Sequence, residues 1–129
     1  MVIGFNKQFP DKIQDGTKKH TIREDKHDKW HAGMKMHMAT GVRTKKYKCF
    51  KLDTCKSTQK IRIWHRSLLV TIVYVDGKCF GQYRKDDEVH NINLIKLSNN
   101  DGFNCIHDFF HWFNKDFTGK IIHWTDLRY

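Results

Sequence analysis

The chain has 129 residues, and 24 Lys and Arg against 14 Asp and Glu give it a formal net charge of +10. This length suffices for one hydrophobic core, and no linker, repeat or low-complexity tract divides the chain, so we expect a single domain over residues 1–129. No stretch approaches the roughly 18 apolar residues of a membrane span, and the short apolar start does not fit a signal peptide. We therefore do not expect a membrane protein, and a cytoplasmic location is favoured.

A short helix that begins near Pro10 and ends at Gly16 is predicted to lead into a strand. Proline suits the first turn of a helix, and glycine permits the backbone conformation that ends one. Side chains alternate along a strand, so Thr21 and Arg23 share one face, and Lys18 lies just before it. A hydroxyl, an ammonium group and a guanidinium group suit phosphate or a polar heterocycle. The alternative is a solvated strand edge on which lysine discourages edge-to-edge pairing.

The middle of the chain is predicted to form short strands. Met34, Met36 and Met38 alternate with less apolar neighbours, as in a half-buried strand. The strongest strand pattern is a run rich in β-branched residues that ends at Asp76-Gly77, a hairpin signal that points to a return strand. We expect strands over residues 34–40, 47–52, 61–64, 68–75 and 79–83.

The C-terminal part is predicted to contain one longer helix. Residues 89–97 are apolar and expected to be extended, and the polar run 98–101 can cap a helix. Apolar residues follow at helical spacing, and we expect Phe103, Phe110 and Phe113 to be buried where this helix packs on the strands. A last strand is expected over residues 120–124.

Neither the cysteines nor the histidines predict a metal site. His107 and His111 lie four positions apart on the predicted helix, but no third ligand follows at a recognised spacing. No pair of cysteines has the spacing of a zinc site, so we expect free and mostly buried thiols. The cysteines are Cys49, Cys55, Cys79 and Cys105. We therefore expect no metal and no cofactor.

Basic residues are concentrated before residue 66, in clusters such as 43–48. This asymmetry favours a basic face and a polyanionic partner, because neutralising phosphates releases counterions. A lysine excess that only confers solubility is the alternative. Among the aromatic residues, Trp30 is the best candidate for stacking on a base, because it lies close to the basic strand in the sequence.

Several motifs in this order resemble those of the ASCH domain family. Residues 16–23 read G-x-K-x-x-T-x-R, residues 30–33 read W-x-x-G, and residues 101–103 read D-G-F. The resemblance spans most of the chain, and the middle third matches least. It implies an α+β fold, a small PUA-like mixed β-barrel of about five to seven strands with a short N-terminal helix and one longer helix near the C-terminus.

The resemblance implies two kinds of activity. The first is binding of RNA or of a modified nucleoside or nucleotide in a basic cleft. The ligand-binding residues would be Lys18, Lys19, Thr21, Arg23, Trp30 and Asp101.

The second activity is hydrolysis, because some ASCH-like proteins are amidohydrolases that deacetylate acetylcytidine with Lys, Thr and a carboxylate. The matching residues would be Lys18, Thr21 and Asp101, although the deacetylases have Glu where this chain has Asp101. A lysine whose pKa is lowered could deprotonate the threonine hydroxyl, which would attack the acetyl carbonyl. Other relatives are ribonucleases, which adds RNA cleavage to the alternatives. A basic face that binds an acidic protein is the third class, and no peptide-recognition signature supports it.

Overall fold

The structure, a computed structural model, describes residues 1–129 as eight strands and three helices. In chain order the elements are β1 (Val2–Gly4), α1 (Pro10–Gln14), β2 (His20–Arg23), β3 (Lys35–Thr40), β4 (Lys48–Thr54), β5 (Ser57–His65), β6 (Val70–Val75), β7 (Lys78–Arg84), α2 (Ile92–Asn100), α3 (Ile106–Trp112) and β8 (Phe117–His123). None of the helices is long and apolar enough to cross a membrane.

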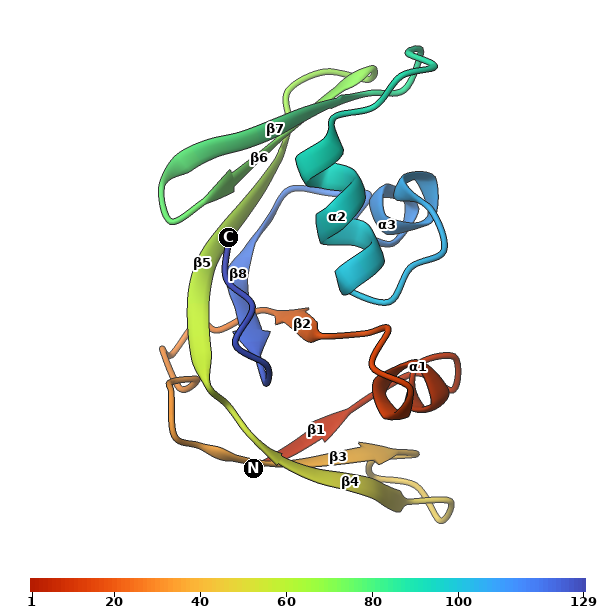
Figure 1. The fold of residues 1–129 in the computed structure, drawn as a ribbon, viewed down its shortest axis with the longest axis vertical. Coiled ribbons are helices and arrows are strands. Elements are labelled where there is room, and N and C mark those ends of the chain that lie inside the picture. The colour runs from red at the N-terminus through yellow and green to blue at the C-terminus, as the bar shows by residue number, and fades with distance from the viewer.

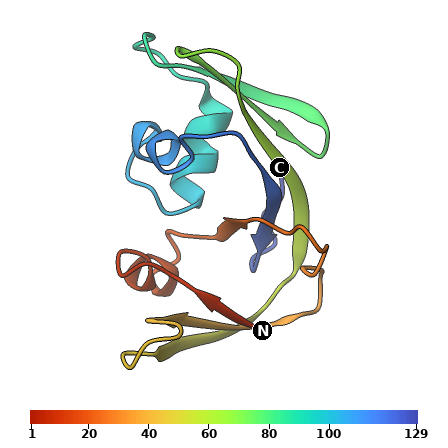
Figure 2. The ribbon, with the colours of Figure 1, turned by 180° about the vertical axis from the view of Figure 1, so that it is seen from behind.

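The strands form two sheets on one curved surface. The smaller sheet has the order β1-β3-β4, with β1 parallel to β3 and β4 antiparallel to it. The larger sheet is antiparallel and has the order β2-β8-β5-β6-β7. Only Cys55 and Lys56 separate β4 from β5, and Figure 1 shows the two strands as one long curved ribbon that connects the sheets. All three helices lie on the concave side of this ribbon in Figure 1 and in the opposite view of Figure 2.

The predicted α+β class is confirmed, but the predicted barrel is not closed. There are eight strands rather than five to seven. Strands β1 and β4 are the edges of one sheet, and β2 and β7 are the edges of the other, so the hydrogen-bonded ladder does not return to its first strand. A closed barrel requires that return.

Most of the predicted strands and the first helix are confirmed. Helix α1 begins at Pro10, and Gly16 follows it with a φ of +84°, in the left-handed region that glycine favours. The β6–β7 hairpin turns at Asp76 and Gly77, which both have a positive φ, as a type I′ turn requires. Met36 and Met38 on β3 are fully buried while Lys35 and His37 are exposed, so the predicted alternation is correct as far as Met38. It is wrong at Ala39, which is also buried, because the strand register shifts between Met38 and Ala39.

The extended segment predicted over residues 89–97 is wrong, because α2 occupies most of it. The Asn91 side chain caps this helix by accepting a hydrogen bond of 2.8 Å from the Asn93 amide. The polar run that was expected to begin a helix ends α2 instead, and α3 begins after a short loop that contains Asp101. The helix predicted after residue 101 corresponds to α3 alone, which begins only at Ile106, and α2 is an additional helix that is not predicted from the sequence. The buried residues of α2 have helical spacing: Leu94, Leu97 and Ser98.

The hydrophobic core consists of 24 buried side chains contributed by both sheets and all three helices. The prediction that Phe103, Phe110 and Phe113 are buried is confirmed. Because these side chains hold α3 and the loop before it against the strands, the core also fixes the position of Asp101 opposite the segment that precedes β2.

Candidate functional site

Lys18 is a buried cation between α1 and β2. Its side chain is 2% exposed, and its Nζ donates hydrogen bonds to the backbone oxygen of Asp101 at 2.5 Å and to Asp101 Oδ1 at 3.0 Å. Burial lowers the pKa of Lys18, and the neighbouring Asp101 carboxylate opposes that shift. An ion pair at this depth needs both partners, because either charge alone would lack compensation.

Gly102 permits the close approach of the two segments that carry this ion pair. Its φ is +92°, and a Cβ atom built on it would lie 3.0–3.2 Å from three carbons of the Lys18 side chain. Any larger residue at this position would push against the lysine as well as strain the backbone. The Asp-Gly sequence at 101–102 therefore supplies both the carboxylate and the space that Lys18 occupies.

A chain of hydrogen-bonded polar groups extends from Asp101 through the buried His20 to the partly buried Tyr129. The His20 Nδ1 atom lies 3.2 Å from Asp101 Oδ1, and its Nε2 atom lies 2.5 Å from the Tyr129 hydroxyl, which also accepts a hydrogen bond of 3.1 Å from Asn100. A carboxylate only accepts, so Nδ1 carries the proton and Nε2 accepts from the tyrosine. Burial lowers the pKa of His20, which favours this neutral ring. The network holds the Asp101 carboxylate in one orientation.

Thr21 and Arg23 lie on the same face of β2, as the alternation predicted. Arg23 donates from Nη2 to the Gly4 backbone oxygen at 2.5 Å and from Nε to Thr21 Oγ1 at 3.3 Å. The guanidinium also lies 5.1 Å from the centre of the Phe5 ring. These contacts fix its orientation, and its remaining N–H groups can bind a ligand.

These four polar residues and several aromatic residues line one small hollow, hereafter the cleft. Its volume is about 160 Å³. It is lined by Gly4, Phe5, Asn6, Phe9, Lys18, Thr21, Ile22, Arg23, Asp101, Phe103, Trp112 and Phe113. Pockets for drug-sized ligands measure about 300–1,000 Å³, so this cleft suits a single planar ring.

Trp112 is the aromatic side chain of the cleft that is most open to solvent. It is 50% exposed, and its ring packs edge-on against Phe9 and Phe103, with centroid distances of 5.9 and 5.8 Å. Trp112 lies at the C-terminal end of α3, off the buried stripe of that helix. An exposed ring beside a polar hollow offers a stacking surface to a base.

The structure brings together four of the six predicted ligand-binding residues: Lys18, Thr21, Arg23 and Asp101. The other two do not line the cleft. Lys19 is exposed. Trp30 is buried and lines a different hollow with Asp28 and Lys120, because its loop packs near β8 rather than near β2's polar face. The sequence alone assigns no role to His20, which bonds to Asp101, or to Tyr129, which bonds to His20.

No group of three His, Cys, Asp or Glu side chains could hold a metal ion. The His107 Nδ1 atom instead lies 2.6 Å from the Tyr83 hydroxyl. All four cysteines are free, but the expectation that they are mostly buried is wrong, since only Cys55 is buried. The other three lie at strand or helix ends and on an outward face, where the core does not reach them.

No known protein family, curated protein or solved structure matches this chain. Only the residues of the cleft itself therefore indicate what it can bind.

Proposed function

We propose that the cleft binds one base of a single-stranded RNA or of a nucleotide, and that the chain is a divergent ASCH-like domain with an open, PUA-like arrangement of strands. The observation that carries this proposal is the composition of the cleft, in which aromatic walls enclose a cation, a hydroxyl, a guanidinium and a carboxylate. A base offers a π face and a polar edge with both donors and acceptors, which such a lining complements.

The fixed orientation of the polar groups supports selective binding. Arg23 and Asp101 are held by hydrogen bonds from opposite sides of the cleft, through Gly4 and through His20. Arg23 is a donor for a ring nitrogen or an oxygen, and a free Asp101 lone pair accepts from an exocyclic amine. Because both are positioned before the ligand arrives, little ordering accompanies binding.

Equilibrium binding of a labelled single-stranded RNA tests this proposal. We expect Arg23→Ala to weaken binding at least about tenfold, because a charged hydrogen-bond donor at the base is lost. Arg23→Lys keeps the charge but not the planar fork, and should recover only part of the affinity. Arg66→Ala, an exposed arginine in the β5–β6 turn, is the matched control. Equal affinity of the Arg23→Ala and Arg66→Ala variants would rule out the cleft as the binding site.

Hydrolysis of an acetylated nucleoside is the second candidate, and the depressed pKa of Lys18 favours it. A neutral Lys18 would take the proton of Thr21, whose Oγ1 would bond to the acetyl carbon while the carbon–nitrogen bond breaks. The departing amine would take that proton, and water would then cleave the ester. In the structure, however, Thr21 accepts a hydrogen bond from Arg23, and Lys18 donates to Asp101. Binding is therefore the function that the geometry supports better.

Release of cytidine from acetylcytidine separates the two candidates. Turnover by the wild type that disappears in both Lys18→Met and Thr21→Ala would replace the binding proposal with hydrolysis, since the two residues act as a unit. Incubation with RNA under the same conditions, followed by electrophoresis, tests cleavage of the strand. We expect no turnover and intact RNA.

A further inference from the structure

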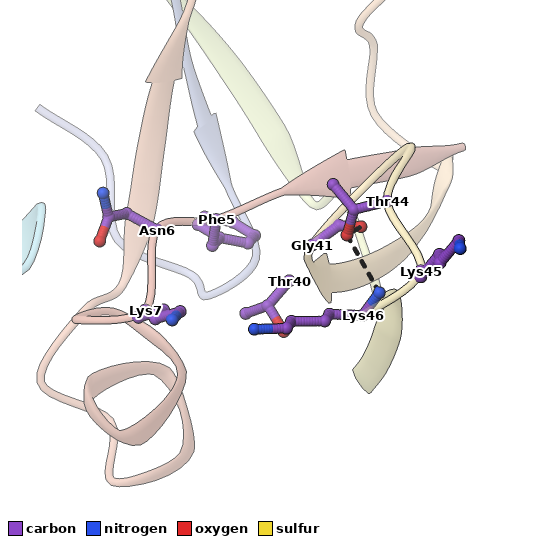
Figure 3. A pocket seen from close by; sticks show the side chains of 8 residues that line it. All are labelled: Phe5, Asn6, Lys7, Thr40, Gly41, Thr44, Lys45 and Lys46. Atoms are coloured by element: carbon purple, nitrogen blue, oxygen red, sulfur yellow. Dashed lines mark hydrogen bonds between the residues drawn. The ribbon is translucent and has the colours of Figure 1, made fainter.

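A second hollow lies beside the cleft and shares two of its residues, Phe5 and Asn6. It has a volume of about 580 Å³ and is lined by Phe5, Asn6, Lys7, Thr40, Gly41, Thr44, Lys45 and Lys46. We call it the lysine pocket. Figure 3 shows it between the segment after β1 and the loop that joins β3 to β4. Because Phe5 and Asn6 line both hollows, the lysine pocket adjoins the cleft.

The lysines of this pocket have no carboxylate partners. The lining contains no acidic residue, and none of Lys7, Lys45 and Lys46 forms an ion pair or a side-chain hydrogen bond. All three are exposed. In Figure 3 the side chains of Lys7 and Lys46 extend toward each other across the pocket, whereas Lys45 points away. The two ammonium groups repel each other, and an anion bound between them would attract both.

The loop that carries Lys46 has a fixed conformation. The Thr44 hydroxyl donates to the Gly41 backbone oxygen at 2.6 Å and accepts from the Lys46 amide at 3.1 Å. Gly41 has a φ of +62°, and a Cβ atom there would lie 2.7 Å from the Lys46 backbone oxygen, so this close turn requires glycine. These contacts hold the backbone of Lys46 at the edge of the lysine pocket.

We propose that the lysine pocket is a phosphate subsite of the cleft, which binds the phosphate attached to the nucleotide whose base stacks on Trp112. This inference rests on the proposed function and assigns the place where the phosphate of its ligand binds. The shared chemistry is a phosphate group next to the base, which either a free nucleotide or an RNA strand supplies.

Dissociation constants for three ligands test the subsite: a nucleoside, its monophosphate and a short single-stranded RNA containing it. We expect the wild type to bind the RNA most tightly and the nucleoside least. The double variant Lys7→Ala/Lys46→Ala should weaken RNA and monophosphate binding about tenfold at low salt and leave the nucleoside unaffected. It should also reduce the slope of log K against log salt by about 0.7, the contribution of one single-strand phosphate contact.

The matched control is Lys78→Ala/Lys96→Ala, which removes the same charge from exposed positions on β7 and α2, outside both hollows. Equal weakening by the two double variants would mean that only the overall charge matters and would overturn the subsite. A wild type that binds all three ligands equally would overturn it too, while the proposed function would stand. If none of the three ligands binds, the proposed function fails, and the subsite fails with it.

Discussion

Lys18 and Asp101 form a buried ion pair across the cleft although 83 positions separate them in the sequence. The pair joins the segment before β2 to the loop before α3, so it contributes to the fold and to the ligand site at once. The two contributions can be separated, because a buried ion pair and an apolar pair of similar volume often stabilise a fold equally.

Asp101→Asn should lower the free energy of unfolding by about 3 kcal/mol, because it leaves the buried Lys18 ammonium without a counter-charge. The double variant Lys18→Met/Asp101→Asn removes that charge as well, so we expect it to be more stable than Asp101→Asn alone. Urea denaturation measures both values. RNA binding should be lost in both variants. A double variant less stable than Asp101→Asn would contradict the view that the buried charge of Lys18 destabilises the fold unless Asp101 compensates it.

Tyr129→Phe should lower the free energy of unfolding by about 1–3 kcal/mol, because Asn100 and the buried His20 each lose a hydrogen-bond partner. It should also weaken ligand binding, since His20 orients the Asp101 carboxylate. Tyr47→Phe removes a hydroxyl from an exposed tyrosine and is the control. If the two variants have the same stability, the Tyr129 hydroxyl does not support the site.

Acid should destabilise the fold below about pH 6.5, the usual pKa of histidine in an unfolded chain. Burial lowers the pKa of His20, and it lowers the pKa of His123 to about 3. Between these values the unfolded chain binds protons that the folded chain does not, so the free energy of unfolding decreases as the pH falls, by at most about 1.4 kcal/mol per pH unit for each group.

Urea denaturation at several pH values between about 7 and 5.5, above the range in which most carboxylates titrate, measures this slope. His123→Gln should reduce it. His27→Gln changes an exposed histidine and should leave the slope as in the wild type. A wild-type slope of zero in this range would mean that the pKa values of the buried histidines do not differ between the folded and the unfolded chain, which would contradict this prediction.

The sequence predicts local features of this protein well. The alternation of methionines in β3, the turn at Asp76-Gly77 and the shared face of Thr21 and Arg23 depend on neighbouring residues, and the structure has all three. The apolar residues of α2 also have helical spacing in the sequence, but the same residues fit a short buried strand. Asn91, which caps that helix, was the signal that distinguishes the two.

Contacts between distant segments were harder to predict. Asp101 was placed in the cleft by resemblance, whereas its support by His20 and Tyr129 depends on the packing of β2, β8 and the last residues against one another. No spacing in the sequence indicates that support. Proximity to β2 along the chain favours Trp30 as the stacking residue, but in the structure α3 places Trp112 in the lining of the cleft.

Trp112→Ala should weaken RNA binding by about 1–3 kcal/mol, the usual contribution of one base stacked on an aromatic side chain. Trp112→Phe keeps an aromatic face and should retain most of the affinity. Comparing it with Trp112→Ala shows whether the loss follows the aromatic face or a disturbed packing of Phe9 and Phe103. Trp64→Ala changes a partly exposed tryptophan on β5, outside the cleft, and is the control. Tryptophan fluorescence adds a direct observation, because a base stacked on Trp112 should quench emission in the wild type and in Trp64→Ala but not in Trp112→Phe. Quenching that persists without Trp112 would move the stacking surface to another part of the molecule.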